Sequence, residues 1–261
     1  MFLLRQEAFY CIIALLDIYS ERRGLVYKKP AKTAPMGWNS WDCFGAAVNE
    51  RQLLENADYM AKYLKPFGWE YIICDIQWYE PLAKNNDYNN FYPLNIDEYG
   101  RLLPAENRFP SAAGGKGFKP IADYCHSLGL KFGIHIMRGV PRSAVHQNLP
   151  VKGSEFGCRD IAHHFSVCSW NTDMYGCRNC EASQQYYNTI FQLYASWGVD
   201  FVKCDDICLT EFRKWDNPYS ADYEIEMIRN AINNCGREMV LSLSPGPAQV
   251  ENAEHLKQNA D

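Results

Sequence analysis

The sequence lacks the features of several protein classes. It has no run of basic residues, and its 26 Lys and Arg are outnumbered by 31 Asp and Glu, for a formal net charge of −5. Nucleic-acid binding therefore has no electrostatic support. The apolar run at residues 9–16 is far shorter than the roughly 20 residues that cross a bilayer. No repeat of solenoid length and no low-complexity tract is apparent. We expect neither nucleic acid nor a membrane as a partner.

The N-terminal residues lack a clear targeting signal. Arg5 precedes the apolar run and Asp17 follows it, but residues 20–24 (SERRG) form a poor cleavage site. We interpret residues 1–30 as a leader or tail outside the fold and residues 31–261 as one partial domain. A secreted or periplasmic location stays open.

Aromatic residues and cysteines are plentiful. Hydrophobic residues make up 47% of the chain and aromatic residues 14%, which supports a sizeable core. There are 11 cysteines, and the spacing of Cys177 and Cys180 resembles half of a zinc site. A structural zinc site usually needs two such pairs, so free thiols, disulfides and a metal remain alternatives.

Short β-rich runs alternate with helical patterns from residue 33 onward. The intervening helices are each closed by a glycine, a common helix C-terminal residue: Gly68, Gly129, Gly198 and Gly236. The predicted strands are residues 35–41, 71–76, 130–136, 199–205 and 238–244. Helix, glycine and strand in series predict α/β units with a parallel sheet.

Two α/β architectures fit this pattern. No glycine-rich phosphate loop follows the first strand, which counts against a nucleotide-binding doubly wound fold. The long segments 77–117 and 137–180 follow strands, where barrel enzymes build their sites. We therefore predict a (β/α)8 TIM barrel truncated after about five βα units. A complete open five-stranded sheet is the alternative.

Charged residues stand at the ends of the predicted strands. Asp75 ends the second strand, His135 and Arg138 end the third, and Lys203 and Asp205 end the fourth. Lys203 and Asp205 are two residues apart and so face the same side. A neighbouring lysine keeps a carboxylate ionised, as a glycosyl-enzyme mechanism requires. A structural ion pair is the alternative.

Four segments make the chain recognisable. Residues 34–44 (APMGWNSWDCF) closely resemble the opening strand of glycoside hydrolase family 27, the α-galactosidases. Residues 108–110 (RFP), 130–134 (LKFGI) and 197–205 (WGVDFVKCD) follow in the order of that family. The resemblance implies a (β/α)8 catalytic barrel that retains anomeric configuration.

The resemblance also implies roles for individual residues. Asp205 falls on the nucleophile and Lys203 on a sugar-binding lysine. Trp41 falls on the aromatic wall of the sugar site, and Asp75 on a carboxylate that holds sugar hydroxyls. His135, Arg138 and Ser244 occupy positions where the family has other residues, and we expect them to contact substrate as well.

Departures from the family pattern affect the choice of sugar. Ile76 replaces a second aspartate after strand two, and residues 242–246 (SLSPG) replace the segment that reads the sugar 2-substituent. Loss of a polar partner for a hydroxyl changes selectivity strongly. We therefore expect a terminal α-galactoside-like sugar, with β-L-arabinopyranose as a related possibility. Trp170 and Tyr175 either wall an extended sugar site or pack within the protein.

The motif that carries the family's general acid/base does not occur. Asp261 is expected to lie in the helix after strand five and is not assigned that role. We predict a retaining glycoside hydrolase that needs no cofactor, takes an oligosaccharide or glycoside, and lacks its acid/base in this chain. The chain alone is then expected to be inactive. The alternatives are a non-catalytic carbohydrate-binding or inactive remnant and a transglycosidase.

Overall fold

The computed structural model describes residues 31, 33–85, 87–89, 91–207, 219, 221–244 and 249–261. The predicted leader, residues 1–30, lies outside the described residues. No helix in the described part is both long and apolar enough to span a bilayer.

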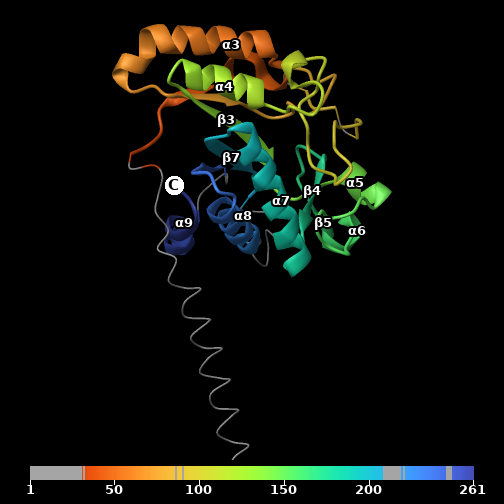
Figure 1. Cartoon of the computed structure of the whole chain (residues 1–261). Coiled ribbons are helices and arrows are strands. Elements are labelled where there is room, and N and C mark those ends of the chain that lie inside the picture. The colour runs from red at the N-terminus through yellow and green to blue at the C-terminus, as the bar shows by residue number, and fades with distance from the viewer. Residues whose placement is uncertain are drawn as a thin grey trace, which may run out of the picture.

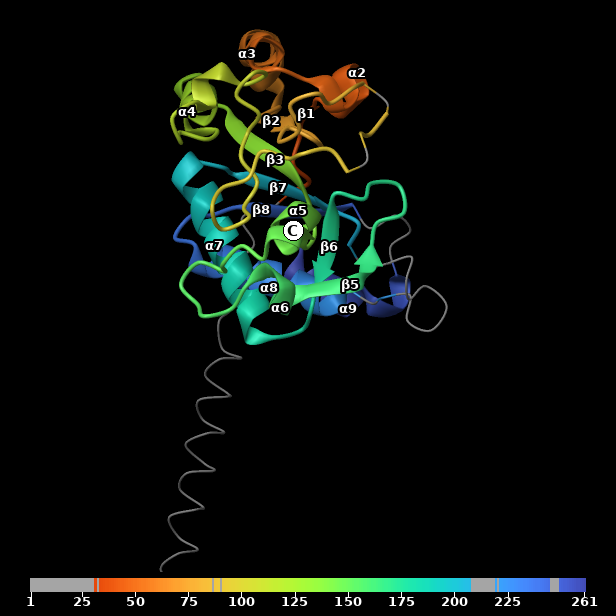
Figure 2. The ribbon, with the colours of Figure 1, turned by 90° about the vertical axis from the view of Figure 1, so that its right-hand side faces the viewer.

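The main sheet has five parallel strands in the order β1-β2-β3-β7-β8. Their bounds are β1 (Gly37–Asn39), β2 (Tyr71–Cys74), β3 (Lys131–Met137), β7 (Phe201–Asp205) and β8 (Val240–Ser244). Each strand lies beside the next one of the series, as in a barrel; β3 and β7 are labelled in Figure 1, and all five strands in Figure 2. The five strand predictions are confirmed, with ends that differ by a few residues.

Helices follow the strands and contact one another in sequence. The successive contacts are α3 with α4, α4 with α7, α7 with α8, and α8 with α9 (Figure 2). Their bounds are α3 (Glu50–Tyr59), α4 (Lys119–Ser127), α7 (Glu181–Trp197), α8 (Asp222–Asn234) and α9 (Ala253–Asn259). This half-barrel of parallel strands with helices is consistent with a truncated TIM barrel.

Short helical segments lie between or beside the longer elements. They are α2 (Trp41–Phe44), a π-helical extension of α3 (Met60–Leu64), and 3-10 turns at Gly45–Ala47, Lys65–Phe67, Pro110–Ala112 and Val250–Asn252. The start of α3 follows from its sequence, because the Asn49 side chain accepts from the Gln52 N–H and the Gln52 side chain accepts from the Asn49 N–H. This reciprocal cap satisfies two main-chain donors at the first turn.

An aromatic cluster packs the helices against the sheet. Phe118 lies edge-on to Trp78 and to Trp197, with ring centroids 5.2 and 5.9 Å apart. All three side chains are buried. The Trp78 indole N–H also donates to the His135 carbonyl at 2.7 Å, so the cluster is tied to β3 below the strand ends.

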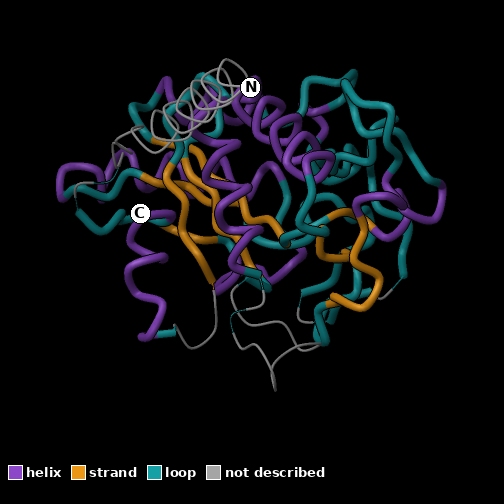
Figure 3. The backbone as a smooth tube through the Cα atoms, turned by 90° about the horizontal axis from the view of Figure 1, so that it is seen from below, coloured by secondary structure: helices purple, strands orange, loops and turns teal. Residues whose placement is uncertain are grey.

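The segment after β3 is not the long loop that the sequence predicted. It holds β4 (Val140–Pro141), α5 (Arg142–Gln147), α6 (Cys158–Ile161), β5 (Ala162–Val167) and β6 (Met174–Cys177). The three strands form a separate antiparallel sheet in the order β4-β6-β5 (Figure 3). These elements have two to six residues each, too few to show a periodicity.

The last residue also differs from its prediction. Asp261 lies beyond α9 and beside β8, where its N–H donates to the Leu241 carbonyl at 3.0 Å. Its Oδ2 accepts from the Leu241 N–H at 2.9 Å and lies 2.8 Å from Arg229 Nη2. Asp261 is thus a sheet-edge residue rather than a helical one.

Candidate active site

The charged residues of the sequence prediction gather at the carboxyl ends of the main-sheet strands. The strand register sets His135 beside Lys203, and Asp205 beside both Met137 and Ser244. Asp75 directly follows β2. Because parallel strands end at the same edge of a sheet, these side chains share one site.

Asp75 is buried and held by three donors. Its Oδ2 accepts from Asn39 Nδ2 at 2.6 Å and from Lys203 Nζ at 2.9 Å, while its Oδ1 accepts from the Ile76 N–H at 2.8 Å. Burial acts to raise the pKa of Asp75, but His135, Lys203 and the Ile76 N–H outweigh it and hold the pKa below its usual range. Asp75 is therefore an ionised acceptor.

Asp205 remains reachable from outside. Its side chain is 20% exposed, its Oδ2 lies 3.3 Å from His135 Nε2, and its Oδ1 accepts from the Asp206 N–H at 2.8 Å. Burial acts to raise the pKa of Asp205, but the His135 contact, the Asp206 N–H and the charge of Lys203 together lower it. Asp205 is an ionised and oriented carboxylate.

The predicted partnership of Lys203 and Asp205 needs correction. Lys203 hydrogen-bonds to Asp75 and acts on Asp205 only through its charge, whereas His135 supplies the direct contact to Asp205. Side chains two residues apart do face the same side, but the long Lys203 side chain reaches past β3 to Asp75, which follows β2 two strands away. The fully buried His135 positions the carboxylate, which is a different role from the predicted contact with sugar.

A row of aromatic rings lies beside the carboxylates. Trp41 stacks on Tyr88 with centroids 5.9 Å apart at 22°, and Tyr88 contacts Trp170 at 5.5 Å. Burial, together with the charges of Asp75 and Asp205, raises the pKa of Tyr88 well above its usual range, which marks its closeness to both carboxylates. Rings of this kind suit the C–H faces of a sugar. Sequence reasoning missed Tyr88, because it lies in an irregular segment without a motif.

Arg138 is fully buried, whereas Ser244 is partly exposed at a strand end. Arg138 is 1% exposed and pairs with Asp206 and Glu224, so the predicted substrate contact is not what its geometry supports. Ser244 is the last residue of β8 and is partly buried, level with Asp205 in the register. Residues 245–248, which continue the SLSPG segment, lie outside the described residues.

Asp173 joins the two long segments beside the site. Its Oδ2 accepts from Gln77 Nε2 at 2.9 Å and from the Tyr79 hydroxyl at 3.2 Å. Gln77 adopts a positive φ of 59° directly after strand β2. The segment after β2 is thereby fixed to the one after β3, which also carries Trp170.

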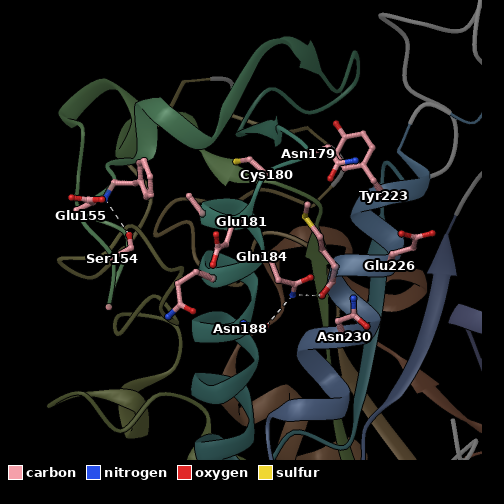
Figure 4. A pocket seen from close by; sticks show the side chains of 15 residues that line it. Ser154, Glu155, Asn179, Cys180, Glu181, Gln184, Asn188, Tyr223, Glu226 and Asn230 are labelled. Carbon is pink, nitrogen blue, oxygen red and sulfur yellow. Dashed lines mark hydrogen bonds between the residues drawn. The ribbon is translucent and has the colours of Figure 1, made fainter. Parts of the chain in front are cut away.

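A large cavity lies away from these residues. It has a volume of about 1190 Å³ and is bounded by α7, α8 and residues 153–156 (Figure 4). Carboxamides such as Gln184 and Asn188 line it together with three glutamates, Glu155, Glu181 and Glu226. None of the predicted site residues lines this cavity, so it is separate from the predicted active site.

Metal ligands and reactive thiols are not assembled in the described part of the chain. No group of three His, Cys, Asp or Glu side chains there is arranged to hold a metal ion. Nine cysteines of that part, Cys177 and Cys180 among them, are free. Burial raises the pKa of the Cys177 thiol, as expected for an inert thiol.

The chain is similar to curated α-galactosidases over most of its length. No protein-family model matches the chain. The α-galactosidase of Coffea arabica is 30% identical over 223 residues, which are 85% of this chain and 44% of that protein. Alpha-galactosidase A of Cellvibrio japonicus is 31% identical over 89% of this chain and 43% of its own length.

Some solved structures are more similar still. A family 27 β-L-arabinopyranosidase from Geobacillus stearothermophilus is 62% identical, with a TM-score of 0.84 over 88% of this chain and 52% of that one. A structure of a variant of that enzyme contains arabinose. This chain spans about half the length of these relatives. On these similarities, the chain belongs to glycoside hydrolase family 27, the α-galactosidase-like glycosyl hydrolases.

Proposed function

We propose that the protein is a retaining glycoside hydrolase and that Asp205 is its nucleophile. The observation that carries the proposal is the environment of Asp205. Its carboxylate is partly exposed at the end of β7, oriented by His135 and the Asp206 N–H, and kept ionised. A nucleophile in double displacement needs these properties.

The proposed chemistry has two steps. In the first, an Asp205 oxygen attacks the anomeric carbon while the bond to the leaving oxygen breaks, and a general acid protonates that oxygen. In the second, water attacks the anomeric carbon, gives its proton to the same residue and releases Asp205. Lys203, whose side chain is 25% exposed, donates a hydrogen bond to a sugar hydroxyl, and the buried Asp75 holds that lysine in place.

The general acid/base is proposed to come from a part of the protein beyond this chain. Relatives are about twice as long as the matched portion, which leaves room for the remaining βα units and the second carboxylate. Retaining enzymes hold the two carboxyl groups about 5–5.5 Å apart, so the acid is expected opposite Asp205, across the aromatic row.

The proposed sugar has the stereochemistry shared by α-D-galactopyranose and β-L-arabinopyranose. Within this class the arabinopyranoside comes first, because the relative of that specificity is 62% identical and the α-galactosidases about 30%. The sequence alone placed galactose first. The two sugars differ by the exocyclic C6 group, so one assay with both decides between them.

Glycosyl fluorides test the nucleophile without the acid, because fluoride leaves without protonation. The 261-residue chain is incubated with β-L-arabinopyranosyl fluoride or α-D-galactosyl fluoride, and fluoride release is followed with an electrode. We expect release above the spontaneous rate, faster with the arabinosyl fluoride. A phenyl glycoside, whose leaving group needs protonation, should release almost no phenol.

Asp205→Asn is the matched variant, since it keeps the shape of the side chain and removes its charge. Loss of fluoride release in this variant supports the assignment. Unchanged release would rule out Asp205 as nucleophile. Sugar binding by calorimetry without any fluoride release would favour a carbohydrate-binding remnant instead.

A further inference from the structure

We propose that Arg138 is a positioning residue that fixes the main chain at Asp206 and thereby aims the Asp205 carboxylate. The inference rests on Asp205 being the nucleophile proposed above. It assigns a function to a buried arginine that lies outside the sugar site itself.

The contacts of Arg138 join three elements. Its Nε donates to the Asp206 carbonyl oxygen, its Nη2 lies 2.9 Å from Asp206 Oδ2, and its Nη1 donates to Glu224 Oε2 at 2.9 Å. Arg138 follows β3, Asp206 follows β7, and Glu224 belongs to α8. Both the charge and the planar shape of the guanidinium are used.

Glu224 is itself held firmly. Its side chain is fully buried, and its Oε1 accepts from the Cys177 N–H at 2.9 Å and from the Tyr187 hydroxyl at 2.7 Å. The Tyr187 oxygen in turn accepts from the Gly139 N–H at 2.7 Å. The carboxylate that orients Arg138 is therefore anchored to β6 and α7, and the network forms a rigid support.

The held conformation at Asp206 is unusual. Its φ is +51°, a left-handed value that residues with a Cβ seldom adopt unless neighbours enforce it. In this conformation its N–H points at Asp205 Oδ1, 2.8 Å away. Arg138 binds both the carbonyl and the carboxylate of Asp206, so it is the group that enforces the turn.

Space for the guanidinium depends on one glycine. A Cβ at Gly176 would lie 1.9 Å from Arg138 Nη1, although the φ of Gly176 is not in the left-handed region. Gly176→Ala therefore displaces Arg138 Nη1 without removing a charge; its Cβ would also lie 2.8 Å from Ser166 Oγ and 3.1 Å from Glu224 Oε2.

The first test measures the rate of fluoride release over a range of glycosyl fluoride concentrations, for Arg138→Met, Arg138→Lys and Gly176→Ala. We expect Arg138→Met to lower the limiting rate on the order of 10- to 100-fold, as for a slightly misplaced catalytic group. The half-saturating concentration should change little, because the sugar contacts stay in place. Arg138→Lys should restore part of the rate.

Arg159→Met is the control. This arginine belongs to the same segment, but it donates to the Val145 and His146 carbonyls and not to a carboxylate of the site. The limiting rate of fluoride release by Arg159→Met should equal that of the wild type.

The second test does not need activity. The carboxyl carbon of Asp205 is titrated by NMR in the wild type and in the variants. A lost N–H donor raises the pKa of a carboxylate, so Arg138→Met and Gly176→Ala should raise that of Asp205, and Arg159→Met should not. This readout keeps the inference testable even if the wild type releases no fluoride.

The proposal would be overturned if the Arg138 and Gly176 variants folded, kept the wild-type limiting rate and left the Asp205 titration unchanged. In that case, inactivity of Asp205→Asn would still support Asp205 as the nucleophile. If Arg138→Met does not fold by circular dichroism, Arg138→Lys and Gly176→Ala decide. Loss of the fold in all three would make Arg138 a purely structural residue and would also overturn the proposal.

Discussion

Asp205 and Asp206 are neighbours in the chain, yet their surroundings shift their pKa values in opposite directions. The pKa of Asp205 is lowered, mainly through His135. For Asp206, burial and the charges of Glu224 and Asp205 outweigh Arg138 and the Cys168 thiol and raise the pKa to about 6. The left-handed turn at Asp206 sends the two carboxylates to different places.

This contrast predicts opposite pH dependences of stability. For Asp206, the folded state keeps a proton that the unfolded state has lost between about pH 4 and pH 6, so its ionisation costs stability as pH rises through that window. Asp206→Asn should therefore become more stable relative to wild type, by about 3 kcal/mol between pH 4 and pH 7 at 1.36 kcal/mol per pKa unit. Urea unfolding at several pH values measures this.

Asp205→Asn is the matched comparison. Because the pKa of Asp205 is lowered on folding, its ionisation stabilises the wild type above pH 3.8, and that stability is lost as pH falls through the folded pKa. The difference between wild type and Asp205→Asn should thus grow in favour of the wild type with rising pH. If the stability differences between wild type and the two variants changed in the same direction with pH, the opposite pKa shifts of Asp205 and Asp206 would be contradicted.

The aromatic row gives a second prediction at this scale. Tyr88→Ala removes the ring that lies between Trp41 and Trp170, and stacking of this kind contributes about 0.5–1.5 kcal/mol. The half-saturating concentration of glycosyl fluoride should rise about 2- to 12-fold. Tyr88→Phe, which keeps the ring, should bind as the wild type does, and equal weakening by both variants would assign the effect to the hydroxyl.

The sequence was informative for site residues on regular strands. Asp75, Lys203 and Asp205 were predicted because strand ends in a parallel sheet converge. The contacts between these side chains were not predicted, because they depend on strand register and side-chain reach. Lys203 contacts Asp75, and His135 contacts Asp205. Tyr88 enters the site through an irregular segment, whose path no periodicity reveals.

Among the elements, predictability followed length. The helix that Gly198 was expected to close is present as α7 (Glu181–Trp197), whose 17 residues display the helical period clearly. The elements of residues 137–180 were missed. Their strands pair with one another and with no strand of the main sheet, so only tertiary contacts define them.

Packing between elements predicts a large difference between two glycines. Gly117 and Gly114 both have positive φ, but a Cβ at Gly117 would lie 2.1 Å from the Trp197 ring, whereas at Gly114 nothing lies within 4 Å. Alanine at Gly114 should cost about 1 kcal/mol of backbone strain. Alanine at Gly117 should cost a further 1–3 kcal/mol of overpacking. Chemical denaturation measures both, and equal losses would contradict the close approach of Trp197.

For the whole molecule, serial βα units predicted a parallel half-barrel, and the sheet order agrees. The helix predicted after the fifth strand is present as α9, but Asp261, which was expected in it, is not helical. Asp261 lies instead beside β8, where a buried arginine and the Leu241 main chain bind it. A single terminal residue shows no periodicity from which such a contact could be inferred.

The contact at the edge of β8 makes a stability prediction. Arg229→Met removes the cation that lies 2.8 Å from the buried Asp261 carboxylate, and breaking a buried pair costs about 3–5 kcal/mol. Arg51→Met, which breaks an exposed pair with Glu55, should cost less than about 1 kcal/mol. Thermal unfolding distinguishes them, and a small loss for Arg229→Met would show that the edge contact contributes little.

The most direct measurement uses a 5-fluoro glycosyl fluoride of the arabinopyranose or galactose series, in which the ring fluorine slows breakdown of the glycosyl-enzyme. The treated chain is digested, and the modified peptide is sequenced by mass spectrometry. The account predicts one sugar per chain, attached to Asp205 in the strand β7 peptide, and none in Asp205→Asn. A sugar attached to another carboxylate, or no adduct on a folded chain, would contradict it.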